Sequence, residues 1–225
     1  MKATRIFILI IVSLQGLISN AQVTRDSVPH LHRIRIGIDL IKPLFSLNER
    51  NYDDYIYKVR NYEASIGYRI NRFIEVPVEI GYLSAIEDDV RYYSYKTKGF
   101  YVKPGINFNV LYSRKRSTPR VELIVGYRLG ITRYNEKSQW LFNEDFWSSK
   151  HVYNNERNTN AFWHEGVLGF RRNFFTTSKT ALGFGVAVKI RSKIQPDSYS
   201  RGIIPGFGSD RSLSGGLNFD VGLMF

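Results

Sequence analysis

The sequence predicts an all-β fold, an eight-stranded antiparallel β-barrel, and three observations indicate it. The 225-residue chain holds 15 Tyr, 15 Phe and 18 Gly, a composition rich in β-forming residues. From Leu31 onward apolar and polar residues alternate with a period of two, the strand period. The alternating segments are joined by polar connections that are short and long in turn. The length suits one domain with a full core.

The N-terminus has the order of a secretory signal peptide. Lys2 and Arg5 precede the apolar run 6–18, and small residues follow at Ser19 and Ala21. A membrane-anchor helix is the alternative, but the run falls short of the 18 or more apolar residues that a spanning helix needs. We therefore expect a signal peptide over 1–21, a periplasmic segment over 22–32, and the barrel domain over 33–225.

Charge and cysteine content limit the classes of anchor and binding partner that the chain could have. The chain has no Cys, so it lacks the thiol that a lipoprotein anchor requires. A formal net charge of +12 would suit nucleic acid. An exported chain does not meet the nucleic acid of the cell, so anionic lipid or polysaccharide is the expected partner class.

The first strand shows the pattern, with Ile34, Ile36 and Ile38 on one face and Arg35 and Gly37 on the other. The eight expected strands cover approximately residues 33–42, 60–70, 73–83, 99–111, 120–133, 159–171, 179–191 and 212–225. The second and third are separated by Asn71-Arg72 alone, which predicts a tight hairpin. The sixth is the least regular and its register stays open.

The connections alternate in length. Residues 71–72, 112–119 and 172–178 are short connections, whereas 44–59, 84–98, 135–158 and 192–211 are long. Barrels of the Gram-negative outer membrane have short periplasmic turns and longer extracellular loops, with both termini on the periplasmic side. The sequence therefore predicts a transmembrane barrel with four long extracellular loops.

Residue size and charge indicate which face is the lumen. A soluble ligand-binding barrel would put its apolar face inside. Here the polar face is crowded with Gly, as expected of a barrel with room only for side chains. That face also carries charges of both signs that could pair when buried, although an ordinary solvated face is the simpler alternative. The expected lumen charge network comprises Arg35, Arg69, Lys103, Arg128, Lys189 and Arg191 with Asp39, Glu63, Glu75, Glu79, Glu122, Glu165 and Asp220.

The C-terminus is the alternating segment 217–225, which ends in Phe225. With this ending and the eight-segment pattern, everything after the signal peptide resembles the small single-chain barrels of the outer membrane protein beta-barrel domain family. The resemblance implies that Phe219, Val221, Leu223 and Phe225 form the signal that the barrel-assembly machinery reads.

Pro77 and Pro104 conflict with the pattern, because a closed barrel has no edge strand and proline lacks the ladder donor. Either each marks a bulge or a strand is misdrawn. His164 is a second conflict, since it falls on the lipid-facing side of the sixth strand. We expect it near an interface or at a register shift.

Catalytic and metal motifs are not recognisable, so we expect no cofactor and no enzyme activity. His151 with Ser148, Ser149, Glu144 and Asp145 offers the residue types of a lipid-modifying outer-membrane enzyme, without its spacing. The basic runs 114–116 with Arg120, and Arg171-Arg172 with Lys179, are expected in solvated turns.

An aromatic cluster lies in the third long connection. Trp140, Phe142, Phe146 and Trp147 could form a loop binding surface, cap the barrel or anchor it in the outer leaflet. We expect a non-enzymatic integral outer-membrane scaffold whose loops serve adhesion or recognition of an extracellular ligand. A lipid-modifying enzyme or a small-molecule binding barrel is the alternative.

Overall fold

The computed structural model describes residues 33–46, 50–52, 55–71, 73–89, 93–111, 121–144, 149–175, 180–194, 203–209 and 213–225. The expected signal peptide and the segment up to residue 32 lie outside these ranges. The elements are β1 (Ile34–Asp39), α2 (Ile41–Ser46), β2 (Arg50–Tyr52), β3 (Tyr55–Arg69), β4 (Ile74–Asp89), β5 (Tyr93–Asn109), β6 (Val121–Glu144), β7 (Ser149–Phe175), β8 (Ala181–Lys193), β9 (Ile203–Ile204), β10 (Gly208–Ser209) and β11 (Leu213–Met224).

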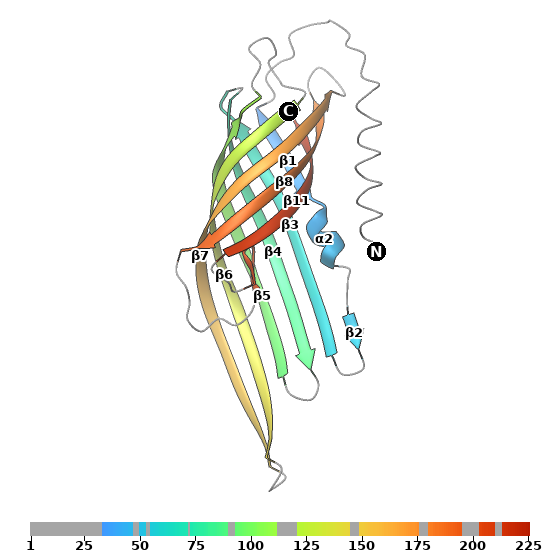
Figure 1. The fold of residues 1–225 in the computed structure, drawn as a ribbon, viewed down its shortest axis with the longest axis vertical. Helices are drawn as coiled ribbons and strands as arrows, with labels where there is room; N and C mark the ends of the chain where they lie inside the picture. Colours follow the sequence, from blue (N-terminus) through green and yellow to red (C-terminus); the bar gives the residue numbers. More distant parts are fainter. Residues whose placement is uncertain are drawn as a thin grey trace, which may run out of the picture.

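The large sheet closes on itself, as Figure 1 shows. Eight of its strands follow the order β1-β11-β8-β7-β6-β5-β4-β3, and β1 pairs antiparallel with both β11 and β3 to close the ring. The short strand β2 pairs with the start of β3. Ile36, for example, lies opposite Leu223 on one side and Ile66 on the other. The predicted eight-stranded antiparallel barrel is confirmed.

The tight hairpin expected at Asn71 is present at the end of the barrel where β1 begins and β11 ends. Ile70 N donates to Ile74 O (3.1 Å), and the Asn71 side-chain oxygen accepts from Phe73 N and Ile74 N, both at 2.8 Å. Asparagine commonly stabilises a turn in this way, by capping the backbone two residues on.

β1 is too short to cover the whole length of β3, and a short helix continues from it. Asp39 Oδ1 accepts a hydrogen bond from Ile41 N (2.9 Å) at the start of α2, as an N-terminal cap does. α2 contacts both β3 and β11, so it covers the seam beyond the end of β1. The first strand was expected to run to about residue 42, but β1 ends at Asp39 and α2 follows it. Residues 44–59 were expected to be loop, but α2, β2 and the start of β3 occupy part of that range.

Pro77 and Pro104 do not mark bulges. Glu75 pairs with Asn107 and Val78 with Pro104, so two residues intervene on each strand and the register is kept. The β4–β5 bridges at Pro77 are missing, and so are the β5–β6 bridges at Pro104, because each proline lacks the N–H donor on that side. The strands are drawn correctly, and the ladder is interrupted without a change in register.

The sixth expected strand corresponds to β7, whose register is regular. Burial alternates from Ala161 to Asn173, with Trp163, Glu165 and Gly169 inside and Phe162, His164 and Phe170 outside. No register shift occurs at His164, so that of the two expected explanations for this residue the register shift is wrong. Its Nδ1 instead makes a hydrogen bond with the hydroxyl of Tyr127 on the neighbouring strand.

Much of the expected loop sequence forms strand, which is a correction. β6 runs on to Glu144 and β7 starts at Ser149, so most of the range 135–158 is a hairpin; β4 and β5 likewise occupy most of 84–98. The backbone pairing continues while the residues turn polar on both faces, and hydrophobic alternation therefore ends before the strands do. Figure 1 shows these strands projecting well past the ring at the lower end. No helix within the described ranges is long and apolar enough to cross a membrane.

Candidate functional site

The outer surface of the barrel is a band of large apolar side chains. Exposed members include Ile36, Ile66, Val125, Leu168 and Ile190, contributed by five different strands. Aromatic pairs lie among them, with ring centroids of Phe73 and Phe108 5.5 Å apart, Tyr82 and Phe100 4.8 Å, and Phe174 and Phe184 5.9 Å. Water would be an unfavourable neighbour for such a continuous surface.

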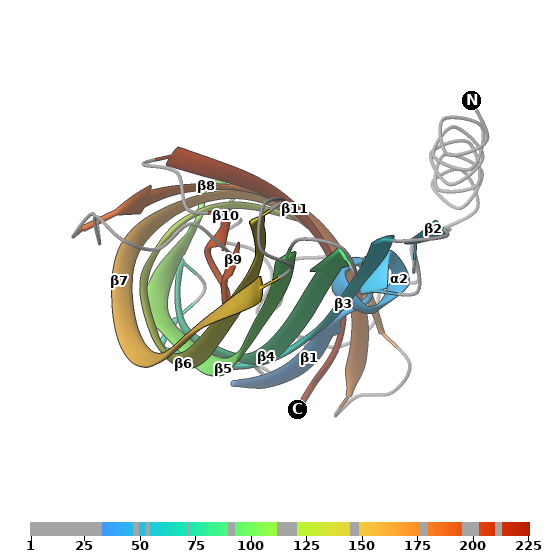
Figure 2. The same ribbon diagram turned by 90° about the horizontal axis from the view of Figure 1, so that it is seen from below.

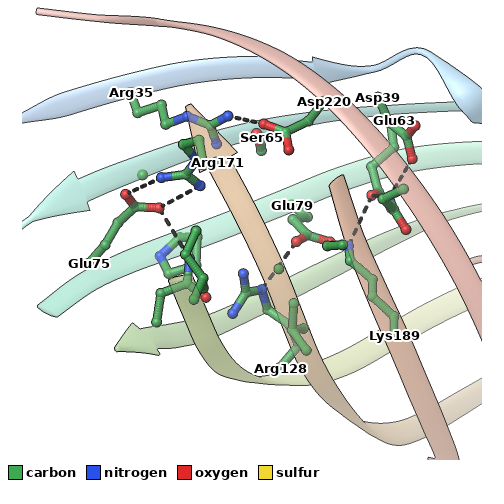
Figure 3. Close-up of a pocket in the computed structure, with 18 of the residues that line it drawn as sticks. Arg35, Asp39, Glu63, Ser65, Glu75, Glu79, Arg128, Arg171, Lys189 and Asp220 are labelled. Atoms are coloured by element: carbon green, nitrogen blue, oxygen red, sulfur yellow. Dashed lines mark hydrogen bonds and ion pairs between the residues drawn. The ribbon is translucent and has the colours of Figure 1, made fainter. Parts of the chain in front are cut away.

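The inner surface holds the charged residues, and they form two clusters of ion pairs. The first lies near the tight-turn end and joins two guanidiniums to two carboxylates. Arg69 Nη2 lies 2.6 Å from Glu122 Oε1, and Arg171 Nη1 lies 2.9 Å from Glu122 Oε2 and 3.0 Å from Glu75 Oε2. Figure 3 shows Arg171 against Glu75, with Arg35 paired to Asp220 above them.

The second cluster lies further along the lumen and is built around Lys103, whose side chain is 0% exposed. Its Nζ lies 2.7 Å from Glu63 Oε2 and 2.6 Å from Glu79 Oε2, and Lys189 Nζ lies 2.6 Å from the same Glu79 oxygen. Arg128 Nε reaches Glu79 Oε1 at 3.2 Å (Figure 3). Burial of charge at this density is tolerable only with such pairing.

The structure thus places all thirteen residues of the expected network on the inner surface, in pairs of opposite charge. The predicted network left out two cations that the structure places in the lumen. Arg171 was assigned to a solvated turn, but it is in phase with Glu165 and Gly169 on β7 and is buried; extending the strand alternation by two residues would have found it. Lys42, from α2, pairs with Glu63 and lies 3.5 Å from Asp39, and no strand pattern could have indicated it.

Little space remains between these side chains. The cavity among Arg35, Glu63, Glu75, Glu79 and Lys189 has a volume of about 60 Å³, enough for a few water molecules. Glycine makes the crowding feasible where aromatic rings lie flat against a neighbouring strand. A Cβ atom at Gly130 would overlap the Trp163 ring, and one at Gly81 would overlap Tyr101.

An apolar plug fills the lumen beyond the second charge cluster, and Figure 2 shows β9 and β10 inside the ring. Ile204 and Phe207 are fully buried in one cluster with Tyr101, Tyr134, Ala161 and Trp163. Gly206 (φ 80°) and Gly208 (φ 115°) take the left-handed backbone conformation that the turn requires. The guanidinium of Arg191 donates to Phe207 O (3.1 Å) and also contacts Glu165 (2.5 Å), so the plug is tied to the charges.

The plug was expected to be part of the long loop 192–211. Its signal in the sequence is the apolar run Ile203-Ile204-Pro205-Gly206-Phe207, which is unusual in an otherwise polar connection. Pro205 and Gly206 are residues typical of a turn, but the local sequence does not show that this turn lies inside the barrel against Tyr101 and Trp163.

Part of the expected loop surface lies in the projecting strands. Trp140 is on β6 and is 37% exposed; Phe142 is on the same strand, with a side chain outside the described set, and Phe146 and Trp147 fall outside the described residues. Of the four side chains, the structure therefore describes only that of Trp140, and a shared surface of the four stays a prediction. The prediction that Trp140 and Phe142 lie in a loop without strand structure was wrong, because both residues are on β6.

The residues weighed for catalysis lie at the tip of the projecting hairpin, where Glu144 is opposite Ser149 in the β6–β7 ladder, but their side chains lie outside the described set. Ser149 and His151 are on β7 and Glu144 on β6, while Asp145 and Ser148 lie outside the described residues. Within the described part of the chain, no group of three or more His, Asp or Glu side chains could hold a metal ion.

The four residues of the expected assembly signal, Phe219, Val221, Leu223 and Phe225, alternate outward along the final strand. Phe225 N donates to Ile34 O (2.9 Å), and Phe225 O accepts from Arg33 N (2.8 Å), so the C-terminal residue completes the closing ladder with β1. Recognition of this strand by the assembly machinery stays a prediction.

Comparison with known proteins adds a family. A family model described as "Domain of unknown function (DUF6048)" matches residues 1–225. The chain belongs to the DUF6048 family. No curated protein matches the sequence. Among solved structures, the DUF6048 chain is similar to the N-terminal β-barrel domain of Pseudomonas aeruginosa OprF, with 12% identity over 86% of this chain and 98% of that one and a TM-score of 0.32. At that score the fold assignment rests on the strand pairing itself.

Proposed function

We propose that the protein is an integral outer-membrane β-barrel, exported by its signal peptide, in which a non-enzymatic barrel carries a surface for recognition outside the cell. One observation carries the membrane assignment. Ile66 and its neighbours face outward, with 49% of Ile66 exposed, whereas Lys103 is 0% exposed inside. This distribution is the reverse of a soluble protein's and suits an apolar solvent outside.

The dimensions of the band support the same assignment. On β5 the outward side chains are apolar or proline from Phe100 to Phe108, nine residues, and Lys98 follows at one end. A transmembrane β-strand needs about 9–11 residues. Phenylalanine at both ends resembles the aromatic girdles that lie at the two membrane interfaces.

Orientation follows from the two ends. The tight Asn71 hairpin and the paired ends of β1 and β11 lie at one end, and the projecting strands at the other. We assign the first end to the periplasm and the second to the outside, in contact with outer-membrane lipids between them. The final strand would be the segment read by the barrel-assembly machinery, and nucleic acid has no place among the partners of an exported barrel.

A lipid-modifying enzyme is the second candidate considered, and no described geometry favours it. A small-molecule binder is closer to the proposal, because the projecting strands carry aromatic and polar side chains. These strands, and not the lumen, are where we place recognition.

Epitope insertion tests the assignment. A tag inserted between residues 145 and 148, beyond the projecting hairpin, should bind antibody on intact Gram-negative cells. The same tag between 112 and 119 should bind only after the outer membrane is permeabilised. The opposite pattern would invert the topology, and recovery of the untagged chain in the soluble periplasmic fraction would remove the membrane assignment.

Planar-bilayer recordings should show no large stable conductance, even when residues 203–209 are replaced by Gly and Ser. The reason is that Lys103, Glu79 and Lys189 bridge the lumen independently of the plug. Eight strands enclose only enough room for side chains, whereas open channels come with about 16–18 strands. Steady, large conductance steps from the unmodified protein would contradict the plugged lumen and favour a transport function.

A further inference from the structure

The projecting parts of β5, β6 and β7 form a cleft next to the plug, on the side away from the lumen charges. Their side chains in phase with the lumen surface line a cavity of about 280 Å³. The lining residues are Tyr93 and Tyr95 from β5, Glu136, Ser138 and Trp140 from β6, and Asn155 and Arg157 from β7. The cleft is several times larger than the cavity among the lumen charges, and it faces the end assigned to the outside.

One wall of the cleft is aromatic. Tyr93 and Trp140 are opposite each other in the β5–β6 ladder, with ring centroids 4.5 Å apart. The Tyr93 and Tyr95 rings are nearly parallel, at 11°, with centroids 6.2 Å apart. Tyr95 is 3% exposed, yet Trp140 is 37% exposed. An indole left partly uncovered beside two packed tyrosines offers an apolar face with a polar edge.

The other wall is polar and contains both donors and acceptors. Arg157 donates to Glu136 Oε2 through Nε (2.9 Å) and lies 2.8 Å from it through Nη2. This two-point contact fixes both side chains. Ser138 and Asn155 are opposite each other in the β6–β7 ladder, next to the pair.

The floor of the cleft is anchored to the plug. The Tyr95 hydroxyl accepts a hydrogen bond from Ile203 N (3.1 Å), the first residue of β9. The aromatic wall is therefore held by strand pairing and by the plug together. A site built on rigid elements loses little freedom when it binds.

These features select among ligand classes. A lipid acyl chain would need an enclosed apolar pocket, and this cleft has a polar wall. A phosphate group would compete with Glu136 for Arg157, whose charge is already balanced. A sugar ring fits both walls, because its C–H faces are apolar and its hydroxyls donate and accept hydrogen bonds. The volume, just below the range of about 300–1,000 Å³ typical of ligand pockets, suits one or two sugar units.

We propose that this cleft binds a surface polysaccharide through one or two of its sugar units, with Trp140 and Tyr93 as the stacking platform and Glu136, Ser138, Asn155 and Arg157 as hydrogen-bonding groups. The inference rests on the proposed function only in that the cleft must face outside the cell. It names the ligand class for the recognition assigned to the projecting strands.

The test uses the full mature chain, folded in detergent micelles, against an array of α- and β-linked hexose oligosaccharides and a parallel peptide array. The best oligosaccharide is then titrated by calorimetry. Trp140→Ala and Tyr93→Ala should each weaken binding about tenfold or more, as loss of a central aromatic contact does. Gln139→Ala, on the same strand with its side chain on the opposite face, should leave the affinity within about twofold.

Three outcomes would overturn the inference: no oligosaccharide bound by the folded chain, equal affinity of the Trp140→Ala and wild-type chains, or binding of peptides instead. Heat-modifiable migration in gels, a property of intact barrels, checks that each variant is folded. The epitope experiment remains a separate test of topology. A chain that is correctly exposed on cells but binds no sugar refutes this inference and leaves the membrane assignment standing.

Discussion

Replacing Glu122 by glutamine should lower the free energy of unfolding by about 3–5 kcal/mol, the usual cost of removing one partner from a buried ion pair. Glu122 is buried and accepts from Arg69 (2.6 Å), Arg171 (2.9 Å) and Asn173 (2.8 Å). Glutamine keeps the size of the side chain but leaves two guanidiniums with less negative charge. Urea titration of the barrel folded into lipid vesicles, followed by tryptophan fluorescence, measures the change.

Glu156→Gln is the matched control. Glu156 also accepts from a cation and an amide, with Lys137 at 2.8 Å and Asn135 at 3.1 Å, but this pair is on the projecting strands and exposed to water. These contacts hold the pKa of Glu156 below its usual range. Exposed pairs contribute little, so the urea midpoint should not move measurably. Equal midpoints for the two variants would mean that water enters the lumen and screens its charges.

Replacing Ile66 by arginine should destabilise the membrane-inserted barrel by about 2–4 kcal/mol, the cost of an arginine at the bilayer midplane. Ile66 faces outward between Ile36 on β1 and Val78 on β4, in the middle of the apolar part of β3. The penalty arises because the guanidinium must leave water for hydrocarbon. Vesicle-based unfolding again gives the measurement.

Gln139→Arg introduces the same side chain on an outward-facing position of the projecting part of β6, where we expect no membrane. It should leave stability unchanged. Other outward positions expected near mid-bilayer should resemble Ile66; they are Val78, Ile106, Val125, Val186 and Val221. A neutral effect of arginine at most of these positions would mean that the lipid-facing and lumen-facing sides had been reversed.

The barrel could be predicted from the sequence because the alternation of apolar and polar residues within each strand indicates which side chains face outward and which face the lumen. Along the first strand, Ile34, Ile36 and Ile38 against Arg35 and Gly37 already separate outside from inside, with no knowledge of its neighbours. The same period brought Lys103, Glu79 and Glu122 onto the inner surface. Balanced charge then indicated pairing, although which acid would meet which base could not be derived from the period.

The projecting strands show where this information ends. From Asn135 to Gln139 on β6, polar residues occupy both faces, and the alternation that identifies a half-buried strand is lost while backbone pairing continues as far as Glu144. The cleft followed from pairing alone, because Trp140 meets Tyr93 through the β5–β6 register. The aromatic composition of this region suggested binding, but it could not place Tyr93 or Arg157 beside Trp140.

The sequence by itself determined the strand count, the orientation of the two faces and the charged character of the lumen, because these depend on local periodicity. The tertiary structure alone decided the α2 seam with Lys42, the plug of Ile204 and Phe207, and the aromatic cleft. Each depends on the space that closure leaves between segments distant in the chain, and on ladder registers that bring particular side chains opposite one another. Local periodicity specifies which face a side chain is on, whereas closure specifies what it meets there.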